Sequence, residues 1–218
     1  MIVVVGPVGV GKGSLITKLI EEFKDKIVIP KQVTNKDIKD DSNFSKISTD
    51  VFLSMKNENK FVKIFTDSEE FFYATTIEEI FSLNEKNKLA IIELNINEAK
   101  KLYLSGLIDA YYVSVFAPNL DVLRERLRLK GGRSLEEITT LLVKSKEEIN
   151  LMENSNIFDY KILNDDFTIA YQELIDIVYS IKPELNQELV RGVENINLLV
   201  KEYSKENKEV NKPLNTEV

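Results

Sequence analysis

A glycine-rich stretch near the N-terminus constrains this chain more than any other feature. Residues 6–14 read Gly-Pro-Val-Gly-Val-Gly-Lys-Gly-Ser, which fits the pattern G-x-x-x-x-G-K. A β-branched run over residues 2–5 precedes it and is typical of a strand buried on both faces. Apolar residues recur at helical spacing over residues 12–24. Strand, glycine loop and helix in this order predict a phosphate-binding loop, because glycines let backbone N–H groups converge on phosphate oxygens.

The residue types in this loop assign roles to its members. Lys12 supplies a point charge for the β- and γ-phosphates, and the helix N-terminus adds partial positive charge. Gly13 follows the lysine where the pattern has Ser or Thr, so Ser14 is the nearest candidate hydroxyl for Mg²⁺. The residues expected to bind ATP here are Gly6, Gly9, Val10, Gly11, Lys12, Gly13, Ser14 and Leu15.

Two absences and the charge balance limit the remaining chemistry. The 218 residues contain no cysteine and no histidine, which excludes a disulfide scaffold, a thiol nucleophile and Ser–His or Cys–His catalysis. Lys and Arg total 29 against 36 Asp and Glu, a net charge of −7. Non-specific nucleic-acid binding needs many cationic contacts, so nucleic acid is not an expected partner. The expected partners are nucleotides, which must be held by the local geometry of a site rather than by net charge.

The N-terminus and the apolar runs bear on location. The first residues lack the charged segment and cleavage site of a signal peptide. The apolar runs are far shorter than the ~20 residues of a membrane span. We therefore expect a cytoplasmic protein with no membrane partner.

Strand and helix patterns alternate along the chain. Residues 89–94, 111–116 and 160–163 are apolar runs typical of strands, and helical patterns lie between them. Thr76 with Glu79, and Ser134 with Glu137, have the spacing of capping boxes, while Asn119 is a candidate N-cap. This alternation predicts an α/β fold with a mainly parallel sheet.

Two stretches interrupt the alternation, and the C-terminal part differs from both. Residues about 31–75 are polar with short alternating pieces, which indicates a small β-rich insertion. Residues about 124–150 contain the pair Gly131-Gly132 and have the character of a mobile flap. Residues 183–204 carry an apolar stripe expected to form an amphipathic helix, which either packs on the core or binds a partner or second copy. Residues 205–218 are charged, aperiodic and expected to be disordered.

The loop and three later stretches together resemble the guanylate kinase family of nucleoside monophosphate kinases. Residues 6–15 are similar to the family's loop. Residues 72–75, Phe-Tyr-Ala-Thr, are similar to Tyr-Tyr-Gly-Thr/Ser. In the lid, Arg126-Leu127 followed by Lys130-Gly131 and Ser134 is similar to Arg-Leu followed by Arg-Gly-Thr-x-Ser. Residues 158–166 are similar to Tyr-Asp-Tyr-x-x-x-Asn-Asp-Asp. All four occur in family order within residues 1–182.

The resemblance implies a fold, a reaction and further site residues. It implies a three-layer P-loop sandwich with a nucleotide-monophosphate insertion and a lid, which moves the γ-phosphoryl group of ATP to GMP with Mg²⁺. Lys12, Arg126 and Lys130 take catalytic roles, Ser14 holds the metal, and Asn164 lies near the adenine site. Residues implied to bind the acceptor are Thr34, Tyr73, Thr75 and Glu93, the last either by accepting from the base or by orienting a metal-bound water.

More modest roles stay open for several of these side chains. Arg126 and Lys130 also fit a solvated helix face. Asn164 and its two acidic neighbours also fit a helix cap, and Tyr73 with Thr75 also fit ordinary strand positions.

The acceptor side departs from the family pattern. Asn35 stands where the family has a phosphate-gripping arginine, and no arginine precedes Arg124. The first family tyrosine falls near Phe44, the guanine-reading glutamate near Lys63, a second carboxylate at Asn95 and a third lid arginine at Leu141. Lys31, Lys36 or Lys46 could replace the phosphate grip, although each also fits a solvated surface.

These departures keep three functions open. The chain is a kinase for GMP or a related monophosphate, a kinase for another phosphorylated acceptor such as a ribose phosphate, or an ATP-binding regulatory protein without turnover. Scaffold proteins with guanylate kinase-like domains typically lose the loop. This chain keeps the loop and changes the acceptor site instead, which favours binding of the donor nucleotide.

Overall fold

The computed structural model describes residues 1–38, 41–66, 70–187, 191 and 197. A five-stranded sheet has the order β2-β7-β1-β8-β9, with every neighbouring pair parallel. Its strands are β1 (Ile2–Val5), β2 (Ile27–Val28), β7 (Leu89–Leu94), β8 (Tyr111–Phe116) and β9 (Tyr160–Leu163). The strands predicted over residues 2–5, 89–94, 111–116 and 160–163 are thereby confirmed.

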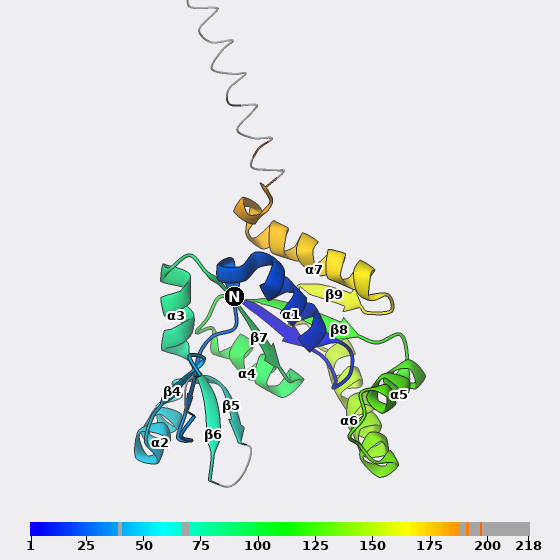
Figure 1. Ribbon diagram of the computed structural model, residues 1–218, viewed down its shortest axis with the longest axis horizontal. Helices are drawn as coiled ribbons and strands as arrows, with labels where there is room; N and C mark the ends of the chain where they lie inside the picture. Colours follow the sequence, from blue (N-terminus) through cyan, green and yellow to red (C-terminus); the bar gives the residue numbers. More distant parts are fainter. Residues whose placement is uncertain (39–40, 67–69, 188–190, 192–196, 198–218) are drawn as a thin grey trace, which may run out of the picture. The chain divides into compact units, whose positions relative to one another are not determined.

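Helices cover both faces of this sheet, as right-handed crossovers between parallel strands require. The chain leaves β1 through α1 (Lys12–Phe23) and the short 3-10 helix η1 (Lys24–Lys26) toward β2 at one edge. It leaves β7 through α4 (Ile96–Ser105) in the opposite direction, toward β8. Figure 1 shows α1 and α4 on opposite sides of the sheet. The predicted α/β sandwich with a mainly parallel sheet is confirmed.

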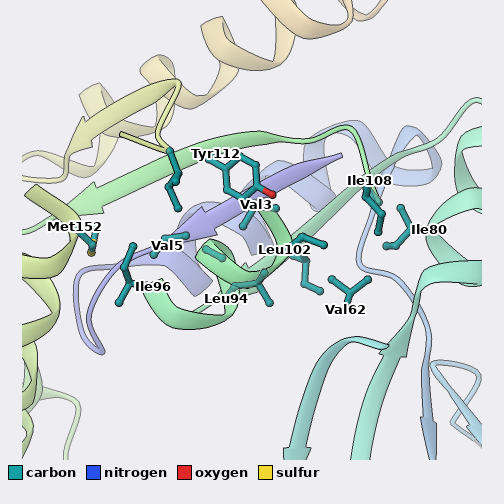
Figure 2. Close-up of a cluster of buried hydrophobic side chains, with 14 of the residues drawn as sticks. Val3, Val5, Val62, Ile80, Leu94, Ile96, Leu102, Ile108, Tyr112 and Met152 are labelled. Atoms are coloured by element: carbon teal, nitrogen blue, oxygen red, sulfur yellow. The ribbon is translucent and has the colours of Figure 1, made fainter. Parts of the chain in front are cut away.

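One apolar core joins the sheet to the helices on the α4 side. Val3 and Val5 alternate toward it from β1, and Leu102 of α4 meets them. Met152 comes from α6 (Leu135–Glu153), and Ile80 comes from α3 (Ile77–Glu85). Figure 2 shows these side chains gathered beneath β1. This core fixes the carboxyl ends of β1 and β7, where ligands bind in open parallel sheets.

A second, smaller sheet lies within residues 32–76 and is called the small sheet below. Its order is β4-β3-β6-β5, with β3 (Gln32–Thr34), β4 (Phe44–Lys46), β5 (Phe61–Thr66) and β6 (Phe72–Thr76). The β3–β4 pair is parallel and the other two pairs are antiparallel. Helix α2 (Thr49–Asn57) covers one face, where the Phe52 ring stacks on Phe72 (Figure 1).

Capping side chains set where several helices begin. Ser134 and Glu137 form the predicted capping box of α6, and the predicted Asn119 cap opens α5 (Leu120–Leu129). The box predicted at Thr76 is wrong in one half. Thr76 caps α3 through the Glu79 N–H, but the Glu79 carboxylate accepts from the Lys31 N–H at 3.2 Å instead of turning back.

The chain divides into two compact units, and the boundary falls inside α7 (Phe167–Ile181). The first is Met1–Tyr171 and the second begins at Gln172. The second contains a short 3-10 helix, η2 (Pro183–Leu185), after α7. The amphipathic helix expected over 183–204 and the tail expected over 205–218 lie mostly or wholly outside the described residues. Among the described helices, none is long and apolar enough to span a membrane.

Candidate nucleotide-binding site

The loop between β1 and α1 adopts a backbone that only glycine tolerates well. Gly9 and Gly11 have φ angles of 93° and 101°, in the left-handed region. A methyl group added at Gly9 would meet Leu127 Cδ2 at 2.9 Å, and one at Gly11 would overlap the Asn164 side-chain amide. Two distant segments, α5 and the end of β9, therefore press against this loop and hold its shape.

Lys12 begins α1 and is almost completely buried. Its Nζ donates to the carbonyl oxygens of Gly6 at 2.5 Å and Pro7 at 2.9 Å, and it lies 3.2 Å from Glu93 Oε1. Glu93 belongs to β7, which pairs directly with β1. The ammonium is therefore held at the mouth of its own loop, where an anionic ligand would replace the two carbonyl oxygens as its partner.

Asn164 contacts the loop from the segment that follows β9, and Arg126 bonds to the next residue of that segment. Asn164 is buried, and its Nδ2 donates to Val10 O at 2.7 Å. Arg126 Nη2 donates to Asp165 O at 3.3 Å, while its Nη1 is buried without a hydrogen-bond partner among the described residues. A buried guanidinium N–H left unpaired is costly. The arrangement suits an anionic oxygen that would accept from it.

The structure distinguishes between the site roles and the ordinary structural roles that the sequence left open for these residues. Asp166, not Asn164, caps α7, because its Oδ1 accepts from the N–H groups of Thr168 and Ile169. Asn164 braces the loop backbone instead. Arg126 is half-buried against the loop's neighbours rather than solvated, whereas Lys130 is exposed and only its backbone N–H bonds, to Arg126 O.

The residues around the loop fit a nucleotide phosphate with Mg²⁺. Ser14 is exposed in the first turn of α1. A methyl group at Gly13 would meet nothing within 4 Å, which leaves room for a water where the motif usually supplies a hydroxyl. Mg²⁺ ordinarily keeps several waters and takes few protein ligands beside phosphate oxygens. Ser14 is the side chain of the loop that would hold it.

Glu148 is a site residue that the sequence did not indicate. It lies on α6, and the Ile96 N–H at the start of α4 donates to its carboxylate. Burial raises the pKa of Glu148, and the nearby Glu93 and Glu98 raise it further, whereas Lys12 and the Ile96 N–H oppose that shift. Glu148 therefore brings a partly buried acid from the predicted lid to the lysine of the loop.

The predicted acceptor residues from the small sheet share one face. Thr34 pairs with Tyr73 across β3 and β6, Tyr73 pairs with Phe65, and Thr75 pairs with Lys63 across β6 and β5. Directly paired residues point to the same side of a sheet. The opposite side is the one that α2 covers.

Asn35, at the position of a family arginine, is used to hold the small sheet together. Its Nδ2 donates to Glu70 O at 2.7 Å and Thr49 Oγ1 at 3.2 Å, and its Oδ1 accepts from the Phe72 N–H. The candidate lysines nearby also have partners. Lys46 lies 3.2 Å from Asp37, and Lys36 lies over the Phe71 ring.

Lys63 forms a direct polar link between the small sheet and the carboxyl end of β7. Its Nζ donates to Glu93 O at 2.8 Å, and the carboxylate of the same Glu93 holds Lys12. The sequence signal for this contact was faint, since Lys63 only interrupts the apolar pattern of residues 61–65. A cavity of about 560 Å³ lies beside it, between β5 and α4.

A parallel sheet whose first strand enters a glycine loop, with a buried lysine in that loop, defines a phosphate-loop nucleotide-binding protein. Comparison with known families makes this specific. The guanylate kinase family profile matches residues 1–181, so the chain belongs to the guanylate kinase family.

Individual relatives agree with this membership. The chain is 31% identical to "Guanylate kinase" of Schizosaccharomyces pombe over 185 residues, covering 82% of this chain and 90% of that one. It is 28% identical to "Guanylate kinase" of Caulobacter vibrioides, covering 83% and 84%. It is also 28% identical to "Guanylate kinase 1" of Oryza sativa, covering 79% of this chain but only about half, 46%, of that longer relative.

A solved structure shares the fold. The guanylate kinase crystal structure from Anaplasma phagocytophilum superposes with a TM-score of 0.54, covering 84% of this chain and 85% of that one. The sequence identity is 15%, so this likeness concerns the fold alone.

Proposed function

We propose that this chain is a phosphotransferase that moves the γ-phosphoryl group of ATP to GMP or a related nucleoside monophosphate. The observation that carries the proposal is the buried Nη1 of Arg126, which has no partner among the described residues, together with a loop lysine that is held by two carbonyl oxygens and Glu93. Both cations are positioned for an anion. Family membership names the reaction class that such a site serves.

Each donor-side residue has a defined task. Backbone N–H groups of the loop and Lys12 bind the β- and γ-phosphates, and Arg126 neutralises charge that develops on the transferred group. Asn164 keeps Val10, and with it the loop, in place. Mg²⁺, held by phosphate oxygens and by Ser14, would supply further charge neutralisation. Gly131 and Gly132, with φ of 71° and 72°, form the joint of a lid made of residues 124–150.

The acceptor binds over the face of the small sheet that carries Thr34, Tyr73 and Thr75. That face looks away from α2, and Lys63 links it to the carboxyl end of β7. The acceptor phosphate then lies between the small sheet and Lys12. The reaction needs no covalent enzyme intermediate, so positioning and charge account for catalysis.

A Lys12→Ala variant tests the donor half of the proposal. Removing a charge-assisted contact should weaken ATP binding about 10- to 150-fold and reduce transfer to GMP by at least as much. Isothermal titration of ATP with Mg²⁺ and coupled ADP release are the two measurements. Lys26→Ala, an exposed lysine beyond α1, is the matched control.

Two outcomes would contradict the proposal in different ways. Unchanged ATP affinity in Lys12→Ala would show that the loop does not bind the donor. ATP binding that depends on Lys12, without transfer to any nucleoside monophosphate or ribose phosphate, would indicate a regulatory nucleotide-binding protein instead.

A further inference from the structure

We infer that Lys63 reads a carbonyl group on the acceptor base, so that the acceptors are 6-oxopurine monophosphates and the purine 2-amino group is not read. This inference rests on the proposed function, because it concerns the acceptor of that reaction. Its practical meaning is that IMP and XMP should serve about as well as GMP, while AMP should be rejected.

The chemistry of the face supports a site that donates hydrogen bonds. Beside Lys63 it carries the hydroxyl residues Thr34 and Thr75 and the Phe65 and Tyr73 rings. No described residue that these strand pairings place on this face is a carboxylate. An ammonium has three donors and no acceptor. It therefore complements the O6 and N7 acceptors of an oxopurine and opposes the amino group of adenine.

Aromatic rings provide the flat contact that a base needs. The Tyr73 ring lies between Phe65, at a centroid distance of 6.1 Å, and Phe44, at 5.6 Å. Phe65 is about half exposed at 54%. Stacking on such rings is strong but tolerant of base identity. Discrimination between bases must therefore come from a polar side chain, and Lys63 is the cation that pairs into this ring cluster from β5.

The surrounding charges disfavour a phosphate at Lys63. Its ammonium donates to the backbone of Glu93, and the Glu148 carboxylate interacts with those of Glu93 and Glu98 and with the Lys12 ammonium near the start of α4. A phosphate dianion placed there would meet these three carboxylates, while one of the two cations nearby, Lys12, is already paired with Glu93. A neutral carbonyl oxygen would not suffer that repulsion.

The two nearest carboxylates already have partners. Glu93 holds Lys12, and Glu98 accepts from the Asn95 N–H at 2.9 Å in the capping box of α4. The Asn95 Oδ1 is likewise occupied, by the Asn97 and Glu98 N–H groups. The carboxylate and amide acceptors of this segment are therefore committed elsewhere, and on the small sheet the Thr34 Oγ1 accepts from the Lys36 N–H at 3.1 Å.

The test compares acceptors and three forms of the protein. With Mg·ATP, kcat/KM for GMP, IMP, XMP and AMP is measured for the unaltered chain, Lys63→Met and Lys63→Glu. In the unaltered chain we expect GMP, IMP and XMP within about threefold of one another. AMP should be lower by roughly 10- to 150-fold, the value of a hydrogen bond to a charged group.

The variants identify the group that reads the base. Lys63→Met should remove most of the discrimination against AMP while leaving the KM for ATP unchanged. Lys63→Glu should raise the GMP/IMP ratio about tenfold, because a carboxylate accepts from the 2-amino group. Lys60→Met is the matched control, since Lys60 is exposed beside β5 and paired with Glu58, and it should leave every ratio unchanged.

Three results would overturn the inference. One is a GMP preference over IMP of tenfold or more in the unaltered chain that Lys63→Met does not change. Another is an equal loss for all acceptors in Lys63→Met, which would assign Lys63 to the acceptor phosphate. The third is equal affinity for GMP, IMP and AMP, measured by calorimetry without ATP. That result would refute recognition of the base by Lys63 even if no transfer occurs. Absence of transfer with unequal affinities would instead refute only the proposed function.

Discussion

The loop at the end of β1 and the small sheet use their polar side chains in opposite ways. Around the loop, Lys12 and Arg126 are buried or half-buried with donors aimed at carbonyl oxygens or left unpaired. In the small sheet, Asn35 spends all its side-chain hydrogen bonds on its own neighbours, and Lys46 is paired with Asp37. The donor side thus has hydrogen-bond donors that a ligand could use, whereas on the acceptor side Asn35 and Lys46 are engaged in contacts within the protein.

This difference teaches where specificity can reside. A site whose cations are held ready binds phosphate strongly whatever the rest of the ligand is. On the acceptor side, Lys63, the hydroxyl groups and the aromatic rings must provide the selection. Loss of an arginine grip can cost 10³–10⁵ in rate for phosphoryl transfer, so the acceptor side also has the greater scope to limit turnover.

The largest expected effect comes from removing Arg126, whose Nη1 has no hydrogen-bond partner among the described residues. Arg126→Ala should lower kcat for phosphoryl transfer by about 10³–10⁵, because it removes the buried guanidinium N–H that we propose donates to the transferred group. The measurement is single-turnover transfer at saturating ATP and acceptor. Arg126→Lys should recover only part of the rate, since lysine keeps the charge but loses the planar fork.

The control for that variant lies two residues along the same helix. Arg128 is exposed and paired with Glu125 through Nη2 at 2.7 Å, so Arg128→Ala should leave transfer within about twofold. Equal losses in the two variants would mean that net positive charge on α5, and not the buried guanidinium, matters. The claim that the donor side holds a buried cation available for a ligand would then be wrong.

A middle-sized effect is expected on stability rather than rate. Asn35→Ala removes three hydrogen bonds that join β3 to α2 and to the start of β6. We expect a loss of about 1–3 kcal/mol in the free energy of unfolding, measured by urea denaturation. Asn35→Arg should lose a similar amount and gain no affinity for the acceptor.

The matched control is Asn57→Ala at the exposed end of α2, which should change stability by no more than about 0.5 kcal/mol. If Asn35→Arg instead tightened acceptor binding without loss of stability, the position would be a vacant phosphate site. The small sheet would then hold unused binding capacity, just as the loop does.

The same contrast explains what the sequence could and could not predict. The loop was predictable because its signal is local: glycine spacing, a preceding strand and a following helix lie within residues 2–24. The partners of the loop were not, because Asn164 bonds to Val10 across 154 positions. Helix α2 was missed because it is only nine residues long and buries a single side chain, Phe52, so its apolar pattern is too short to distinguish a helix from a strand.

The resemblance to a family identified more of the candidate site residues than the apolar and charge patterns of the sequence could, but it had a limit. It implied roles for Arg126 and Asn164 at the nucleotide; in the structure Asn164 bonds to the loop and Arg126 bonds to the neighbouring Asp165. It could not show that Asn35 had become a structural residue, because that depends on backbone groups of Glu70 and Phe72 brought close by folding. Nor could it indicate Glu148, whose role depends on the start of α4.

The smallest expected effect concerns Glu148, where the predicted lid reaches the loop. Burial raises its pKa, so its contribution to stability is full below the ordinary glutamate pKa of about 4.3 and is lost as pH rises through the higher folded-state value. Glu148→Gln keeps an acceptor for the Ile96 N–H and removes the buried charge. We therefore expect its melting temperature to exceed that of the unaltered chain by about 1–4 °C at pH 8, and the difference to vanish near pH 4. Glu147→Gln, one exposed position earlier, controls for loss of a surface charge. A lower melting temperature for Glu148→Gln at pH 8 would mean that attraction to Lys12 outweighs burial, and that the acid stabilises the loop in its charged form.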